Sequence, residues 1–202
     1  MPVPPPPDPS PGSPGRPRPA PVALYLVRHA DAGDALLWRK PDQLRPLSET
    51  GRSQAVGLVD VLALLPVSRV LSSPYARCRQ TVEPIAHDRE LPVEVVDELA
   101  AGTRLARVLR LVRAVASERA VLCSHTDVIG AILAHLVAGG HLVDAGPLRL
   151  EPGSTWVLTT GPGGLVHGRY LPPASLDALP GQEAPAAPMG DQAPLEPSAA
   201  QA

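Results

Sequence analysis

The sequence has no phenylalanine, only five tryptophan or tyrosine residues, and only two cysteines, Cys78 and Cys123. A hydrophobic core must therefore be built from leucine, valine, isoleucine and alanine. The two cysteines lie inside regular hydrophobic segments and not at disulfide-framework spacings, so we expect a reducing, cytoplasmic environment. Both thiols are expected to be small buried hydrophobic groups, because nothing in the sequence places a base beside them.

Long hydrophobic runs and an excess of charge of one sign are also missing. No apolar run approaches the roughly 20 residues needed to span a bilayer, and the amino-terminal residues lack the hydrophobic stretch of a signal peptide. The formal net charge is -2 at pH 7, so no general electrostatic field attracts nucleic acid or an anionic membrane. We therefore expect no nucleic-acid or membrane partner, and any anion binding must be local.

Proline is abundant but unevenly placed along the chain. Of the 27 prolines among 202 residues, 11 lie in residues 1–21 and 7 lie in residues 172–202. Such a composition favours an extended chain and cannot bury a core. We therefore expect one folded domain at 22–171 between two disordered tails, 1–21 and 172–202. The arginine-containing amino-terminal tail is also compatible with binding to a proline-recognising partner.

The middle of the chain alternates short aliphatic runs with longer amphipathic stretches, which is typical of an α/β protein. This pattern predicts a three-layer α/β/α fold with a central, mainly parallel sheet. Strands are expected at 22–27, 69–72, 91–96, 120–124, 155–159 and 165–170. Helices are expected at 48–65, at 104–116, at 127–138, and from an N-cap at Ser73 with Pro74 in the first turn; Pro84 should kink or end that last helix.

Chemically active residues follow several of the expected strands. In an open α/β sheet, ligands bind at the carboxyl ends of the strands, so these positions should share one rim. The positions hold two arginines, two histidines and two carboxylates: Arg28, His29, Arg77, His125, Asp97 and Glu98. Guanidinium groups and helix N-termini bind phosphoryl oxygens. Two imidazoles beside one phosphate suggest that one attacks phosphorus and the other stabilises charge, while a carboxylate protonates the leaving group.

Four segments, taken in order, also resemble a known family. They are LVRHADA at 26–32, RPLS at 45–48 with GRSQA at 51–55, SSPYARCRQT at 72–81, and LCSH at 122–125. They are similar to the histidine phosphatase superfamily, and most similar to its short branch of SixA-type phosphohistidine phosphatases, including DELA at 97–100. The resemblance covers residues 22 to about 156 and implies a phosphoglycerate mutase-like fold.

The resemblance implies specific roles for individual residues. His29 would be the nucleophile that forms a phosphohistidine, Arg28 and Arg77 would bind the phosphate, and His125 would complete the pocket. Neither a metal nor a cofactor is implied. Glu98 stands where the family's proton donor is expected, although the short branch varies at this position.

The proton donor has alternatives, and the residues after the two histidines depart from the family pattern. Asp31 and Asp97 are alternative proton donors. Ala30 follows His29, and Thr126 follows His125, where glycine is common in the superfamily; both substitutions are small.

The expected function is a phosphatase acting through a phosphohistidine at His29. The insertion at 31–47 is short, which leaves little room for a lid and favours a bulky substrate such as a phosphohistidine protein. A small-molecule phosphomonoesterase acting on nucleotide or sugar phosphates is the first alternative. A catalytically silent phosphate-binding or adaptor domain is the second.

Overall fold

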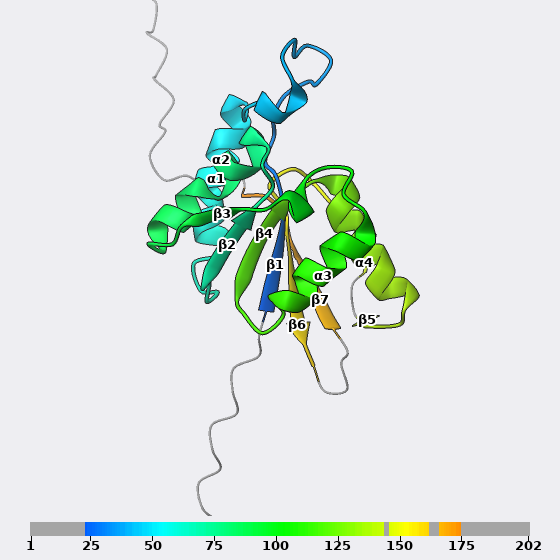
Figure 1. The fold of residues 1–202 in the computed structure, drawn as a ribbon. Helices are drawn as coiled ribbons and strands as arrows, with labels where there is room; N and C mark the ends of the chain where they lie inside the picture. Colours follow the sequence, from blue (N-terminus) through cyan, green and yellow to red (C-terminus); the bar gives the residue numbers. More distant parts are fainter. Residues whose placement is uncertain (1–22, 144–145, 162–165, 175–202) are drawn as a thin grey trace, which may run out of the picture.

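A seven-stranded sheet runs through the middle of the structure, with helices on both of its faces (Figure 1). The structure is a computed structural model, and it describes residues 23–143, 146–161 and 166–174. Figure 1 shows α1 (Glu49–Val61) and α2 (Ala76–Asp88) on one face, and α3 (Leu105–Ala114) and α4 (Thr126–Ala138) on the other. The predicted three-layer α/β/α fold is therefore confirmed. The two expected disordered tails lie outside the described residues, except for 172–174.

The strand order of the sheet is β3-β2-β4-β1-β6-β7-β5. Four strands are mutually parallel, namely β1 (Ala23–Arg28), β2 (Arg69–Ser72), β3 (Val93–Val95) and β4 (Ala120–Ser124). β6 (Thr155–Thr160) runs antiparallel to β1, β7 (Val166–Leu171) runs antiparallel to β6, and the short β5 (Leu142–Val143) is parallel to β7. The expectation of a mainly parallel sheet is thus confirmed.

The strand register brings the ends of three parallel strands together. Arg28 pairs with Ser124, and Ser72 pairs with Cys123. The residues that directly follow β1, β2 and β4 therefore lie side by side at one edge of the sheet.

The side chains of the strands alternate between two hydrophobic cores. Leu26 and Leu122 face the core that contains Val108 and Ile129 of α3 and α4. Tyr25 and Val121, one position away, face the core that α1 and α2 cover. This alternation follows from the two-residue period of a strand, and it fixes the sheet between its two helical layers.

The sequence predicted one helix start correctly and one incorrectly. Ser48 caps α1 by accepting a hydrogen bond from the Gly51 N–H at 3.0 Å, as expected. Ser73 does not cap α2, which begins at Ala76 after Tyr75. The Ser73 hydroxyl is instead 2.9 Å from His125 Nε2, so it serves the cluster of residues at the strand ends.

Pro84 lies inside α2 and does not end it, so of the two outcomes expected from the sequence, a kink or an end, the end is wrong. Proline cannot donate the helical hydrogen bond to the carbonyl four residues earlier. Val82, Ile85 and Ala86 are all buried on the same helix, and their burial offsets that single missing bond.

Two one-turn helices complete the described elements: η1 (Asp42–Leu44) precedes α1, and η2 (Asp97–Leu99) follows β3. The remaining predicted elements shift by only a few residues; for example, α1 ends at Val61 and α3 spans Leu105–Ala114. In the part of the chain with a described structure, every helix is too short or too polar to cross a membrane.

Candidate active site

His29 stands at the end of β1 with one ring nitrogen held by the backbone. Its Nδ1 lies 2.8 Å from the carbonyl oxygen of Ala30. Because a carbonyl oxygen can only accept a hydrogen bond, the ring proton sits on Nδ1 and the lone pair sits on Nε2. Arg77 Nε donates to that Nε2 at 3.2 Å. The nitrogen that can act as a nucleophile is therefore oriented toward a guanidinium group.

Burial is the main cause that lowers the pKa of His29, and together with the nearby charges of Arg77, His125 and Arg28 it brings this pKa to about 3. The hydrogen bond to the Ala30 carbonyl acts in the opposite direction but does not compensate. His29 is therefore a neutral imidazole at neutral pH, which is the form that can attack an electrophile.

Arg77 lies in the first turn of α2 and joins the two histidines. Its side chain is only 5% exposed, and its Nη2 lies 3.3 Å from His125 Nδ1. The guanidinium also stacks over the ring of Tyr75, 4.6 Å from the ring centroid. A buried arginine held in this way presents its donors in a fixed orientation, which suits an oxyanion.

His125 links the end of β4 to the start of α4. Its Nε2 lies 2.9 Å from the Ser73 hydroxyl, and its ring packs edge-on against Tyr75 and His29 at centroid distances of 4.6 Å and 5.3 Å. Since Arg77 only donates hydrogen bonds, a neutral His125 accepts at Nδ1 and carries its proton on Nε2, toward Ser73.

Arg28 completes the group at the end of β1. Its Nη1 donates to the Leu150 carbonyl, while its Nε is buried without a hydrogen-bond partner among the described residues. A buried donor without a partner is costly, so this position is suited to an anionic ligand. We call Arg28, His29, Arg77 and His125 the histidine–arginine cluster.

The cluster can bind a tetrahedral phosphoryl group and attack it. Two guanidinium groups supply charge-assisted donors, and the N-termini of α2 and α4 lie next to Arg77 and His125. A neutral imidazole with its lone pair on Nε2 is the nucleophile that phosphoryl transfer needs. The structure thus brings together the four residues that the sequence analysis assigned to phosphate chemistry.

Sequence reasoning missed Asp42, which lies on η1. The Asp42 carboxylate accepts from Arg77 Nη2 at 3.0 Å and from Arg45 Nε at 2.8 Å, and the Asp42 carbonyl accepts from Arg77 Nη1 at 2.9 Å. Partial desolvation alone would raise the pKa of Asp42, but the hydrogen bond from Arg45 and the charge of Arg77 lower it. An ionised carboxylate therefore occupies donors of Arg77 that a substrate oxyanion would use.

The structure does not bring Glu98 into contact with the cluster. Its carboxylate lies 3.0 Å from Arg107 Nε on α3, and its own backbone N–H and Arg107 lower its pKa. Asp97, the neighbouring alternative, is exposed on η2. The Asp31 carboxylate accepts from the Ser48 hydroxyl and from the Gly33 N–H at 3.2 Å, so it stabilises the start of α1.

The two cysteines are buried, as predicted, but Cys78 also has an unexpected neighbour. Its Sγ lies 3.6 Å from His125 Nε2. Burial alone would raise the pKa of Cys78, yet hydrogen bonds with Cys123 and His125 lower it to about 6. The expectation that no base lies beside either thiol is therefore wrong, because distant segments bring the imidazole there.

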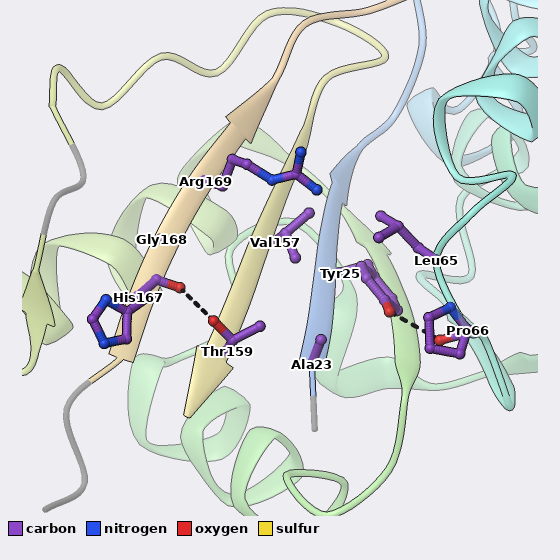
Figure 2. Close-up of a pocket in the computed structure, with 9 residues that line it drawn as sticks. All are labelled: Ala23, Tyr25, Leu65, Pro66, Val157, Thr159, His167, Gly168 and Arg169. Carbon is purple, nitrogen blue, oxygen red and sulfur yellow. Dashed lines mark hydrogen bonds between the residues drawn. The ribbon is translucent and has the colours of Figure 1, made fainter. Parts of the chain in front are cut away.

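A separate cavity of about 410 Å³ lies against β1, β6 and β7 (Figure 2). Its lining residues are Ala23, Tyr25, Leu65, Pro66, Val157, Thr159, His167, Gly168 and Arg169. None of them belongs to the histidine–arginine cluster. Figure 2 shows the Tyr25 hydroxyl donating to the Pro66 carbonyl, a hydrogen bond of 2.9 Å, so this lining group is already hydrogen-bonded within the protein. Across the residues with described positions, no three His, Cys, Asp or Glu side chains are grouped to hold a metal ion.

Comparison with known proteins agrees with this geometry. A sequence model described as histidine phosphatase superfamily (branch 1) matches residues 24–101. An 8-oxo-(d)GTP phosphatase of Mycolicibacterium smegmatis is 31% identical over 153 residues, which cover 73% of this chain and 47% of that protein. The chain therefore spans about half the length of this relative.

Two further relatives carry the name SixA. The phosphohistidine phosphatase SixA of Escherichia coli is 29% identical over 123 residues, covering 57% of this chain and 74% of that protein. A solved structure of the protein histidine phosphatase SixA with tungstate superimposes with a TM-score of 0.61 at 24% identity, covering 76% of this chain and 97% of that one. The structural likeness establishes a common fold.

Proposed function

The chain belongs to the histidine phosphatase superfamily, in its SixA-type branch of phosphate-hydrolysing enzymes, and we propose that it hydrolyses phosphohistidine in a protein substrate without a metal. The observation that carries this proposal is the state of His29. It is a neutral imidazole whose lone pair on Nε2 faces the guanidinium of Arg77. Binding alone would need only the arginines, so this prepared nucleophile argues against a silent adaptor domain.

The proposed reaction has two steps. In the first, His29 Nε2 forms a bond to phosphorus while the bond from phosphorus to the substrate nitrogen breaks, and the leaving imidazole takes up a proton from the protonated form of the proposed donor carboxyl group. Arg28, Arg77 and His125 stabilise the charge on the transferred oxygens. In the second, water attacks the phosphohistidine at His29, which releases inorganic phosphate and restores the neutral imidazole.

We propose Glu98 as the proton donor because of its place after β3, with Asp97 and Asp31 as the alternatives. Glu98 is ionised and paired with Arg107, so it has to leave Arg107 and take up a proton before it can act as an acid. Asp42 competes for the role because it contacts Arg77 directly.

The ionisation of these carboxylates favours a particular substrate class. Both Glu98 and Asp42 have lowered pKa values, so neither holds a proton ready at neutral pH. A phosphoester releases a poor leaving group and depends on such a proton more than phosphohistidine does. The phosphorus–nitrogen bond of phosphohistidine is therefore the better match.

A small-molecule phosphomonoesterase is the second candidate. The similarity to the mycobacterial 8-oxo-(d)GTP phosphatase favours it, although this chain spans only 47% of that protein. A large loss of ester hydrolysis in Glu98→Gln, with little change in phosphohistidine hydrolysis, would show that the acid matters for esters alone.

The decisive experiment measures phosphate release in EDTA from para-nitrophenyl phosphate and from a histidine-phosphorylated protein. Wild type, His29→Ala and the control His87→Ala, an exposed histidine of α2, are compared. We expect activity in wild type and the control, and none in His29→Ala. Activity that survives in His29→Ala, or that needs a metal, would refute the proposed mechanism. Turnover of nucleotide or sugar phosphates alone would move the assignment to the second candidate.

A further inference from the structure

The segment that joins β1 to α1, residues 31–47, stands away from the sheet and is drawn in blue to light blue at the top of Figure 1. We call it the arm. Three of its leucines are largely exposed: Leu36 at 83%, Leu37 at 75% and Leu44 at 58%. Elsewhere in the described chain, the large exposed hydrophobic residues lie singly. The arm therefore concentrates apolar surface that the fold does not bury.

Hydrogen bonds hold the base of the arm in place. Arg45 Nη1 donates to the Ala32 carbonyl at 2.9 Å, and the Ser48 N–H donates to the Asp31 carbonyl at 3.0 Å. Asp42 ties the arm to Arg77 of the histidine–arginine cluster. The exposed leucines are thus carried by an anchored structure beside the site.

The tip of the arm is also ordered by its own contacts. The Leu36 N–H donates to the Asp34 carboxylate at 2.8 Å, and Trp38 Nε1 donates to the Pro41 carbonyl at 3.1 Å. A groove of about 240 Å³ lies between tip and base, and Leu37, Trp38 and Leu47 are among its lining residues. Leu37 belongs both to the exposed leucines and to the lining of this groove, so the arm offers apolar side chains at its tip and inside the groove.

We propose that the arm is a docking surface for the protein that carries the phosphorylated side chain, an inference that rests on the proposed function. Leu44 shares η1 with Asp42, and Asp42 contacts Arg77 of the cluster, so a protein whose phosphate reaches Arg77 also meets the arm. Exposed, clustered apolar groups mark an interaction surface, because water disfavours them and a protein partner can cover them.

The charge of the arm favours a protein over a polyphosphate. It carries three carboxylates and three cationic side chains, so it offers no net charge to attract a nucleoside triphosphate. The balance likewise gives no attraction to an anionic membrane. The partner chemistry that fits is an apolar patch next to a phosphorylated residue.

The test compares one reaction on two substrates that differ only in size. The substrates are a protein phosphorylated on histidine with phosphoramidate and the free amino acid phosphohistidine. The variants are the double change Leu36→Ser with Leu37→Ser, and the control Leu64→Ser, which alters a leucine that is 97% exposed beyond the end of α1. We expect the double variant to lose at least tenfold in kcat/KM on the protein, through KM, and less than twofold on free phosphohistidine.

Several outcomes would overturn the docking proposal. Equal losses on both substrates would mean that the leucines act on the chemistry and not on docking. Wild type that hydrolyses free phosphohistidine as efficiently as the protein would refute docking while the proposed chemistry stands. Wild type that hydrolyses neither substrate, but does hydrolyse para-nitrophenyl phosphate, would refute the proposed substrate class and the docking surface together.

A membrane is the remaining alternative for exposed leucines. Co-sedimentation with vesicles of phosphatidylcholine and phosphatidylglycerol checks it. Binding in wild type that the double variant loses, with protein turnover unchanged, would assign the leucines to lipid and overturn the proposal. We expect no vesicle binding in either protein.

Discussion

The parallel and antiparallel parts of the sheet differ in what they contribute: the first carries the candidate site, and the second carries packing residues. The parallel half, β3-β2-β4-β1, ends at His29, Ser73 and His125, and Arg77 follows in the helix after β2. The antiparallel half, β6-β7, contributes the fully buried Trp156 and no residue of the histidine–arginine cluster. Parallel strands send all their carboxyl ends to one edge, whereas antiparallel strands send them to both. The comparison shows that the site depends on strand direction, and the other half supplies packing.

The largest effect should come from removing the anchor of the antiparallel half. Trp156→Ala is expected to lower the free energy of unfolding by about 3 to 5 kcal/mol, because it leaves a large cavity. The indole is fully buried, and its Nε1 donates to the Arg149 carbonyl at 2.8 Å. Urea unfolding measures the change. The control Val137→Ala, a half-exposed position on α4, should change stability by less than about 1 kcal/mol.

Activity per folded molecule of Trp156→Ala separates an effect on stability from an effect on catalysis. Trp156→Ala should keep most of its turnover of para-nitrophenyl phosphate at low temperature. A loss of turnover well beyond the unfolded fraction would break the division between the two halves.

The next effect concerns the parallel half. Arg77→Gln is expected to lower kcat/KM by about 10² to 10³, because it removes a buried charge-assisted donor at the transferred phosphoryl group. Steady-state kinetics with para-nitrophenyl phosphate measures the loss. The matched control is Arg79→Gln, two positions along the same helix and exposed. A similar loss in the control would mean that helix charge matters and not the contact with the histidines.

A pH effect should follow from the buried state of His29. Its pKa is lowered from 6.5 to about 3 in the folded protein, so between these values the unfolded chain binds a proton that the folded one does not. The contribution of His29 to the free energy of unfolding should therefore be fully present above pH 6.5. As the pH falls below that value, the free energy of unfolding should decrease by up to about 1.4 kcal/mol per pH unit.

Urea unfolding at pH 7, 6 and 5 measures this dependence in wild type and in His29→Gln. The variant lacks the titrating group and should lose less stability than wild type over the same range. Parallel losses in the two proteins would contradict the lowered pKa of His29.

The smallest effect tests the carboxylate that occupies Arg77. Asp42→Asn should tighten inhibition by inorganic phosphate by about two- to fivefold, because a half-exposed ion pair that competes with the ligand is worth about 0.5 to 1 kcal/mol. Asp34→Asn, an exposed carboxylate of the same arm, serves as the control. Weaker phosphate inhibition in Asp42→Asn would mean that Asp42 helps to hold the anion.

The residues that could be predicted from the sequence are those at strand ends. A continuous apolar run such as 22–27 predicts a central strand, and strand direction then places His29 and His125 on one rim. The same reasoning placed Arg77 at this rim, because its position depends only on the turn that opens α2, and the motif resemblance then gave it a phosphate-binding role. The positions of these three residues follow from the strand pattern and the sheet topology, and they do not depend on the conformation of a long loop.

The residues that escaped prediction depend on loops or on distant contacts. Asp42 contacts Arg77 because the conformation of the loop before α1 brings η1 next to α2. Hydrophobic periodicity in the sequence does not predict the conformation of such a loop. Ser73 stands in a sequence typical of a helix cap, but its hydroxyl lies 2.9 Å from Nε2 of His125, a residue 52 positions away in the sequence. Pro84 stays within α2 because burial, which sequence spacing shows poorly, outweighs one lost hydrogen bond. The cytoplasmic location and a partner for the proline-rich tails stay predictions.

An imidazole can carry a phosphoryl group on either ring nitrogen, and the two isomers can be distinguished by ³¹P NMR. In this protein the backbone decides between them. The Ala30 carbonyl oxygen lies 2.8 Å from Nδ1 of His29 and accepts its N–H, which leaves Nε2, the acceptor of the hydrogen bond from Arg77, as the only ring nitrogen with a lone pair. A trapped phosphoenzyme should therefore be a single regioisomer, phosphorylated at Nε2, and the choice is made by a main-chain atom that no side-chain substitution can remove.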